Sequence, residues 1–236
     1  MDPHEGSYPG LAPYAYVANK PLVLVDPTGM DISTHTDKDG NVLAVYDDGD
    51  LGVYKHENAK TKDEVDKSRK QAGSTSGDGE KMGETDYWDE FLDSGSKPAG
   101  TIMFGSSWDG EIENRHQQSL SMDLYTIMKN STHGGIFDIK VGRSFEGRRI
   151  AGKYASARSA GNYLAGYNAS TGTEFGGKLY GFDQYMRLAG VYQSDGFRGV
   201  YEHLWSGKTF GPAPYYGETS YTGRMIYQGW KKGRPQ

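Results

Sequence analysis

The sequence predicts a mixed α+β fold that is mainly helical, with a few short strands and a small β-hairpin region near the start. Apolar residues recur at helical spacing in several stretches after residue 82, whereas apolar and polar residues alternate over residues 41–56. The strand-like runs do not alternate regularly with the helical ones, which argues against a parallel α/β sheet. The 34 glycines and 18 tyrosines favour many turns and tyrosine-lined surfaces over a helical bundle.

The N-terminal third of the chain is predicted to consist of three short regions. Residues 1–30 contain several prolines and a Pro-Thr-Gly turn, so we expect only short extended segments there. Residues 41–56 are predicted as a hairpin closed by the Asp-Gly pair at 48–49, whose flanking aspartates lack the loop of a calcium site and are expected in a solvated turn. Residues 57–81 are charged and small, which predicts a short helix followed by a flexible linker to a main domain over 82–236.

The main domain is predicted to alternate helices, turns and two strands. We expect helices over residues 84–91, 109–128, 152–168, 182–193 and 224–230, and strands over 101–104 and 136–141. The helix over 152–168 would bury Leu164 and Tyr167 and present a polar edge with Arg158 and Asn162, which are one helical turn apart. Its small residues would let another backbone or a ligand approach closely. An ordinary core helix with a solvated edge is the alternative.

Composition and charge exclude several classes of protein. The absence of cysteine excludes disulfides, thiolate catalysis and Cys-ligated zinc. The sequence has no run of about 18 apolar residues, so we expect no transmembrane helix. Residues 1–5 show neither a basic nor an apolar region, so no signal peptide is expected at this end. The net charge is −5, but bases outnumber acids between Arg143 and Lys178, which is compatible with a phosphate-bearing substrate.

A specific motif lies within residues 1–30. It reads Ala-Pro-Tyr-Ala-Tyr-Val-Ala-Asn-Lys-Pro-Leu over residues 12–22 and Asp-Pro-Thr-Gly over residues 26–29. This resembles the end of the core of Rhs/YD-repeat proteins, in which a cage of β-repeats precedes a variable C-terminal toxin. Some members release the toxin by aspartate-dependent self-cleavage after this motif. Asp26 stands at the motif aspartate, but a turn residue that accepts backbone hydrogen bonds is the interpretation we favour for it.

A second resemblance covers roughly residues 110–230. The blocks that carry it lie at residues 137–140, 160–166, 186–190, 214–218 and 224–226. Their order resembles the polymorphic toxin type 44 group and C-terminal domains attached to Rhs cores in Bacteroidetes, and it implies a ribonuclease-like activity. Arg158 and Ser159 stand where several members carry an acidic pair, which argues against an acid-based role at that place.

Three residues before the helix of 152–168 are candidate catalytic groups. Asp138 and Lys140 share one face of the predicted strand, where Asp138 could bind a divalent metal and Lys140 could stabilise charge on a phosphate. A salt-bridged strand edge explains the pair equally well. His133 beside the Gly134-Gly135 pair fits a ribonuclease that moves the 2′-hydroxyl proton without a metal, although a lone loop histidine is more often a surface residue.

The remaining candidates lie on the predicted helix and near the C-terminus. Arg158, Ser159 and Asn162 would hold a phosphate or oxyanion by charge-assisted bonds, the alternative being a buried cap or ion pair. The C-terminal candidates are Glu218 as a catalytic acid, Arg224 as the other wall of the same cleft, and Tyr215 and Tyr216 as stacking platforms for a base or sugar. Plain core packing is the alternative that we favour for the two tyrosines.

These observations favour the C-terminal toxin of an Rhs-type protein that cleaves RNA in a neighbouring cell. A cell-wall glycan hydrolase with Glu218 or Glu174 as its acid is the alternative, and a non-enzymatic receptor-binding or structural tip is a third class. The toxin hypothesis implies secretion into a target cell by the Rhs cage and a type VI-like or similar machinery, without membrane insertion. It also implies a cognate immunity protein as a partner. No cofactor is certain, and a divalent metal is possible.

Overall fold

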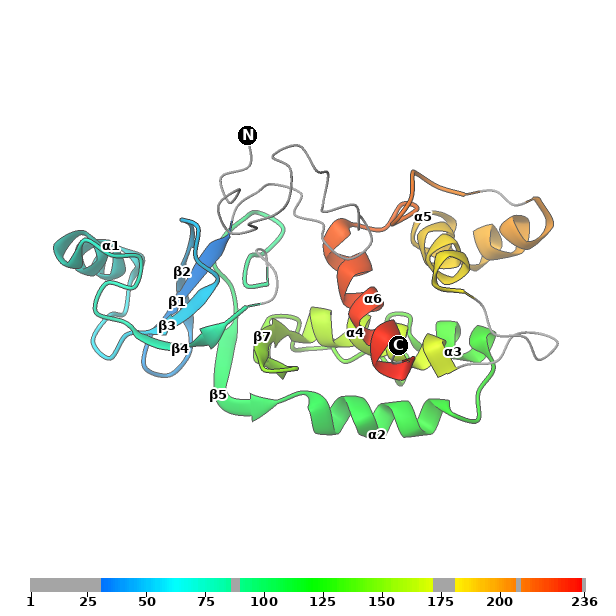
Figure 1. Ribbon diagram of the computed structural model, residues 1–236, viewed down its shortest axis with the longest axis horizontal. Coiled ribbons are helices and arrows are strands. Elements are labelled where there is room, and N and C mark those ends of the chain that lie inside the picture. The colour runs from blue at the N-terminus through cyan, green and yellow to red at the C-terminus, as the bar shows by residue number, and fades with distance from the viewer. Residues whose placement is uncertain (1–30, 86–89, 172–180, 207–208, 235–236) are drawn as a thin grey trace, which may run out of the picture. The chain divides into compact units, whose positions relative to one another are not determined.

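The computed structural model describes residues 31–85, 90–171, 181–206 and 209–234 (Figure 1). Its helices and two small sheets confirm the predicted α+β fold. The chain forms two compact units, one made of residues 30–113 and 139–161, the other containing residues 114–138 and 162–236. We call the first the sheet unit, because all the described strands lie in it, and the second the helical unit. The compact units therefore divide the chain differently from the predicted boundary at residue 82.

The first sheet of the sheet unit has the strand order β2-β1-β3-β4. Its strands are β1 (Ile32–Thr36), β2 (Val42–Asp47), β3 (Gly52–Lys55) and β4 (Glu80–Glu84). Strand β1 pairs antiparallel with β2 and parallel with β3, and β3 pairs antiparallel with β4. The predicted hairpin between the two halves of residues 41–56 is therefore wrong, because β1 lies between them.

The Asp-Gly turn that suggested the hairpin folds back onto β1 instead. The amides of Asp48 and Gly49 both donate to the carbonyl of Asp31, at 3.2 and 2.9 Å, so the turn closes against the start of β1. The Asp48 carboxylate is also not solvated as expected, since it accepts from Ser33 at 2.7 Å and pairs with Arg69. Long-range contacts thus override the local turn signal.

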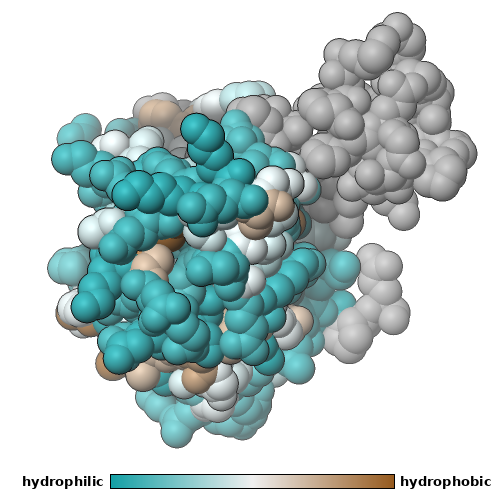
Figure 2. Space-filling model, turned by 90° about the vertical axis from the view of Figure 1, so that its left-hand side faces the viewer, coloured by the Kyte–Doolittle hydropathy of each residue, from teal (hydrophilic) through white to brown (hydrophobic). Residues whose placement is uncertain are grey.

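Helix α1 (Lys62–Ala72) confirms the short helix predicted after residue 57. Thr61 caps its N-terminus in a capping box with Glu64, and Gly73 ends it with a φ of 64°. The side of the sheet unit that carries α1 is mostly hydrophilic (Figure 2). The loop over 73–79, predicted as a linker, instead connects α1 to β4 within one sheet unit.

The second sheet has the order β5-β6-β7. Strand β5 (Thr101–Ser107) confirms the strand predicted at 101–104, and it pairs parallel with β6 (Glu146–Ile150). Strand β7 (Lys153–Ser156) pairs antiparallel with β6. Both residues of the turn between them, Ala151 and Gly152, have positive φ, as a two-residue hairpin of type I′ requires. Tyr154 of β7 packs with Val53, Phe91 and Ile102 in the core of the sheet unit.

The strand predicted over 136–141 is wrong, because this segment is a series of turns. The Phe137 amide donates to the Asn130 carbonyl and the Asp138 amide to the Gly135 carbonyl, both at 3.0 Å. Three consecutive residues, Phe137 to Ile139, are buried, which a strand with one buried face would not allow. Asp138 and Lys140 therefore do not share a strand face. Asp138 is buried and Lys140 is exposed.

The helical segments follow the predicted spacing, with corrected bounds. They are α2 (Asp109–Ser119), α3 (Leu124–Asn130), α4 (Ala157–Thr171), α5 (Phe182–Ser206) and α6 (Ser220–Gly233). The predicted helix over 109–128 is two helices, because Asp123 caps α3 by accepting from the Thr126 amide at 2.7 Å. The predicted helix over 152–168 begins as β7, and α4 starts only at Ala157. Helix α5 continues beyond 193 and bends at Gly196, whose φ is 61°.

Within the helical unit, the C-terminal part of α4 packs against α6 with the backbones in close contact. A Cβ added at Gly166 would lie 1.9 Å from the Ile226 carbonyl oxygen, and one added at Gly229 would lie 1.8 Å from the Tyr163 carbonyl oxygen. The small residues of α4 therefore admit another backbone, one of the two possibilities predicted from the sequence. Buried side chains from α3, α4, α5 and α6, together with Tyr216 in the segment before α6, complete the core: Leu124, Ala169, Tyr185, Met186, Leu188, Val191, Val200, Tyr216, Ile226 and Trp230.

Candidate functional site

The structure brings two of the predicted catalytic residues together in the helical unit. The Nδ1 atom of His133 lies 3.4 Å from Oδ2 of Asp138. The imidazole is 86% exposed, whereas the carboxylate is only 3% exposed. Because Nδ1 faces the carboxylate, Nε2 is the ring nitrogen that a substrate can reach. A carboxylate at Nδ1 favours the tautomer in which Nε2 can accept a proton.

The loop that carries this pair is built tightly onto the end of α3. Gly134 has a φ of 78° and donates its amide to Asp138 Oδ2 at 3.0 Å. A Cβ at Gly135 would lie 2.2 Å from the Asn130 carbonyl oxygen, so only glycine fits there. The buried ring of Phe137 anchors the far side of the loop. The glycine pair and the phenylalanine thus fix the carboxylate beside the imidazole.

Cationic groups lie close to the loop along the chain and in space. The Arg115 guanidinium of α2 donates from Nη1 to the Ile136 carbonyl at 2.5 Å, inside the same loop. Lys129 lies in the last turn of α3, directly before the loop. Arginine and lysine side chains are the groups that bind phosphate oxygens by charge-assisted hydrogen bonds. The loop therefore combines a proton acceptor with positive charge.

The predicted binding residues Arg158 and Ser159 make structural contacts in the sheet unit. The Arg158 guanidinium donates from Nη2 to the carbonyls of Glu90 and Leu92, at 3.2 and 3.5 Å, and lies over the Phe145 ring. Ser159 donates its hydroxyl to Glu90 Oε1 at 2.5 Å. This is the buried-cap arrangement that we gave as the alternative for this cluster.

Glu90 is the residue in this cluster that the sequence did not reveal. Its side chain is 1% exposed and also accepts from the Ser156 amide at 2.7 Å, at the start of α4. The carboxylate thus satisfies the N-terminus of the helix, where negative charge is favoured. The predicted amphipathic helix over 84–91 did not mark Glu90 as special, and residues 86–89 of that segment lie outside the described residues.

Glu90 makes the free energy of unfolding of the sheet unit depend on pH, and Glu90→Gln tests this dependence. Burial raises the pKa of Glu90 to about 7, against the hydrogen bonds from Ser159 and Ser156. Because the folded pKa lies above the unfolded value of 4.5, this group favours the folded state at low pH, and that contribution is lost as pH rises toward 7. Relative to wild type, Glu90→Gln should therefore gain up to about 3 kcal/mol of stability between about pH 4.5 and 7, measured by urea unfolding. A pH-independent difference would contradict the raised pKa.

The predicted C-terminal residues are mainly packed in the helical unit. Tyr216 is buried in the core, and its hydroxyl bonds Asp183 and Arg187. Tyr215 packs against the same core, so core packing describes both tyrosines.

The other predicted binding and catalytic residues are scattered. Glu218, Arg224 and Asn162 are half-buried in the helical unit. Lys140 belongs to the sheet unit, whereas Asp138 belongs to the helical unit. Glu174, the other candidate acid, lies outside the described residues. A single cleft uniting all of these groups stays a prediction.

The basic strip between Arg143 and Lys178 is largely engaged in local contacts. Arg143 pairs with Glu111, and Arg148 pairs with Glu146. Arg149 donates to the Met82 carbonyl at 2.8 Å. These charges stabilise the sheet unit, so the strip is weaker evidence for a phosphate-bearing substrate than its composition suggested.

The described residues contain neither a metal-binding cluster nor a membrane-spanning helix. Within the described ranges, His, Cys, Asp and Glu form no cluster of three or more that could hold a metal ion, so Asp138 belongs to no such group there. Among the described helices, none has the length and apolar character needed to cross a membrane.

Comparison of the chain with protein-family models, curated proteins and solved structures finds no match.

Proposed function

We propose that the chain is the C-terminal effector of an Rhs-type interbacterial toxin and cleaves RNA in the target cell, with His133 as the general base. The observation that carries the activity is the exposed imidazole held 3.4 Å from a buried carboxylate. A histidine titrates near neutral pH, so it is the side chain best suited to proton transfer under cellular conditions. The motif over residues 12–29 supports the assignment to an Rhs-type protein.

The proposed reaction uses the His133 imidazole, the cationic side chains of Arg115 and Lys129, and a proton from solvent. Nε2 of His133 takes the proton of a ribose 2′-hydroxyl, and the resulting oxygen attacks the adjacent phosphorus. The P–O5′ bond breaks, the 5′-oxygen leaves with a proton from solvent, and a 2′,3′-cyclic phosphate forms. Arg115 and Lys129 would bind the phosphate oxygens as negative charge builds up on them.

Delivery and protection follow from the same proposal. An effector of this kind reaches its target through the Rhs cage and a type VI-like or similar secretion machinery. Its producer needs a cognate immunity protein that binds and blocks the toxin. Both partners are proposals that rest on the sequence resemblance.

The compartment in which the chain is toxic tests this function. We would express the full chain in bacteria with and without a periplasmic targeting signal. RNA cleavage predicts killing from the cytoplasm alone. Killing from the periplasm alone would instead indicate a wall hydrolase, and toxicity from neither compartment would indicate a receptor-binding or structural tip.

Asp138 is proposed as a positioning residue, and Asp138→Asn tests that role. Asparagine retains an oxygen that can accept from the Gly134 amide, but it removes the charge beside His133. We expect kcat for RNA cleavage to fall about tenfold with KM unchanged, since a partly exposed ion pair contributes roughly 1 kcal/mol. A change in KM alone would place Asp138 in substrate binding instead.

A further inference from the structure

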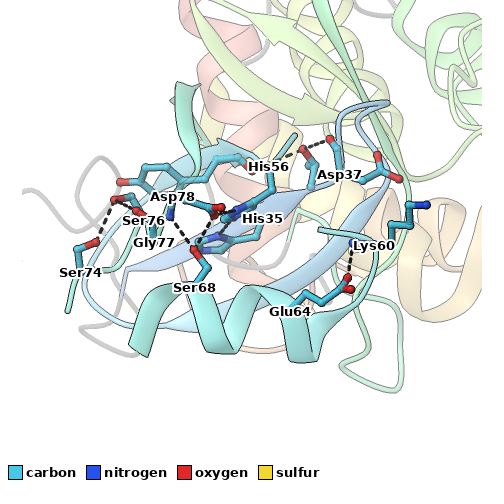
Figure 3. Close-up of polar contacts among 12 residues, drawn as sticks. His35, Asp37, His56, Lys60, Glu64, Ser68, Ser74, Ser76, Gly77 and Asp78 are labelled. Carbon is cyan, nitrogen blue, oxygen red and sulfur yellow. Dashed lines mark hydrogen bonds and ion pairs between the residues drawn. The ribbon is translucent and has the colours of Figure 1, made fainter. Parts of the chain in front are cut away.

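A chain of polar groups centred on two buried histidines lies within the sheet unit, and Figure 3 shows its His35, His56 and Asp78. His35 of β1 and His56, directly after β3, are both fully buried, and His35 Nδ1 lies 2.8 Å from His56 Nε2. His56 Nδ1 lies 2.7 Å from Asp78 Oδ1. On the other side, His35 Nε2 lies 3.2 Å from the Ser33 hydroxyl, which also lies 2.7 Å from Asp48 Oδ2. The result is a continuous path from Asp48 to Asp78.

The number of protons in this path decides its charge. Each of the four links between consecutive groups needs one proton. Two neutral imidazoles supply one proton each, the serine hydroxyl supplies one, and two ionised carboxylates supply none. The path is therefore one proton short of full hydrogen bonding unless it holds an additional one. The two imidazoles at the centre of the path are fully buried, so a hydrogen bond that they leave unmade is costly.

The charges around the path favour this additional proton. Arg69 of α1 pairs with Asp48, so the path with ionised carboxylates and neutral imidazoles has a net charge of −1 together with Arg69. One further proton makes the cluster neutral. The other titratable or charged groups near the histidines are Tyr46, Tyr54, Asp50, Asp66 and Lys81. Asp66 pairs with Lys62 and Asp50 accepts from Tyr54, so these groups are already neutralised or bonded.

The path also fixes the loop over 73–79 onto the sheet. The Asp78 carboxylate accepts from the Ser68 hydroxyl at 2.5 Å, and the Asp78 amide donates to the same hydroxyl at 2.7 Å. A Cβ at Gly79 would lie 2.9 Å from His56 Nε2, so the loop backbone lies directly against the imidazole. Figure 3 shows Asp78 and Ser68 converging on the histidine pair. Losing the link between His56 and Asp78 would leave the loop held by the bonds of Asp78 to Ser68 and of Thr75 to Asp50, without its bond to the imidazole.

We propose that the histidine pair holds one shared additional proton and that this proton locks the 73–79 loop onto the sheet, so that the loop loosens as pH rises. The proton belongs to the pair, since interacting sites titrate together. Burial and the neighbouring His56 charge lower the pKa of His35 to about 3, which accords with a pair that carries a single positive charge. This device is independent of the proposed RNA cleavage.

Nitrogen-15 NMR of the histidine-labelled full chain at about pH 7 tests the proton count, since an isolated imidazole is mostly neutral there. We expect one of the two buried imidazoles to carry protons on both nitrogens. Asp78→Asn should remove this signal, and Asp63→Asn, an exposed carboxylate on α1, should leave it unchanged. Two neutral imidazoles in the wild-type chain, or an additional proton on Asp48, would overturn the proposal.

Unfolding equilibria give a second test that does not depend on assigning the spectra. A folded state that holds one more proton than the unfolded state loses about tenfold in its folding constant per pH unit. From about pH 7 upward, the wild-type chain should therefore destabilise more steeply than Asp78→Asn, with hydrogen exchange in residues 73–79 accelerating in parallel. Equal pH slopes in the two proteins would overturn the proposal.

Discussion

Replacing His133 with glutamine is expected to lower the rate of RNA cleavage by about 10²–10⁴-fold, the usual contribution of a general base. Glutamine retains polarity at this position but cannot take a proton at neutral pH. The fold should be unaffected, because the imidazole is 86% exposed and its only described charged partner is Asp138. Single-turnover cleavage of a defined RNA by the purified full chain measures the effect.

Thr132→Ala is the matched control for this substitution. Thr132 is the neighbouring residue, and its hydroxyl donates to the Lys129 carbonyl at 2.8 Å without contacting the carboxylate of Asp138. The Thr132→Ala variant should therefore cleave RNA at a rate close to that of the wild type. Wild-type cleavage by His133→Gln, with both variants folded, would exclude His133 as the base.

Gly229→Ala and Gly166→Ala are each expected to destabilise the helical unit by about 3 kcal/mol, at the upper end for overpacking in a closely packed core. The new methyl group at 229 would overlap the Tyr163 carbonyl oxygen, 1.8 Å away, and also the Tyr167 amide nitrogen at 2.9 Å. Backbone atoms cannot rotate aside as the end of a flexible side chain can. Helices α4 and α6 would have to separate, which would disrupt the packing of Ile226 and Trp230.

Gly110→Ala is the control for a glycine in a helix without a close neighbour. A Cβ at Gly110, in the first turn of α2, would have no atom within 4 Å. This substitution should stabilise the chain slightly, by up to about 1 kcal/mol, because alanine favours helix. Urea unfolding compares all three variants. A Gly229→Ala chain as stable as wild type would show that α4 and α6 do not approach this closely.

Local signals in the sequence predicted the helices better than the strands. The Thr61-x-x-Glu64 capping box and Gly73 mark both ends of α1, and Asp123 marks the break before α3 once a cap is considered. Strand β1 was missed because its buried residues include Thr34 and His35, whose polar side chains hide the alternation. Burial of those side chains depends on partners far along the chain.

The residues of the candidate site, His133 and Asp138, were predicted from the sequence, but their proximity was not. His133 and Asp138 were selected for different roles, and their proximity depends on the turn at Gly134 rather than on a strand. Glu90 could not be found from the sequence, because it meets Ser156 and Ser159 only after residues more than sixty positions apart fold together. Arg158 was predicted as a binding group on the polar edge of a helix that begins at residue 152, whereas α4 begins at Ala157 and the guanidinium donates to the carbonyls of Glu90 and Leu92.

The products of the purified chain acting on RNA test the central proposal most directly. The full chain would be incubated with tRNA, rRNA and DNA, with and without divalent metal ions, and the fragment ends analysed. Base catalysis by His133 predicts RNA fragments that end in 2′,3′-cyclic phosphate and are absent with His133→Gln. RNA that stays intact under every condition would contradict the proposed function.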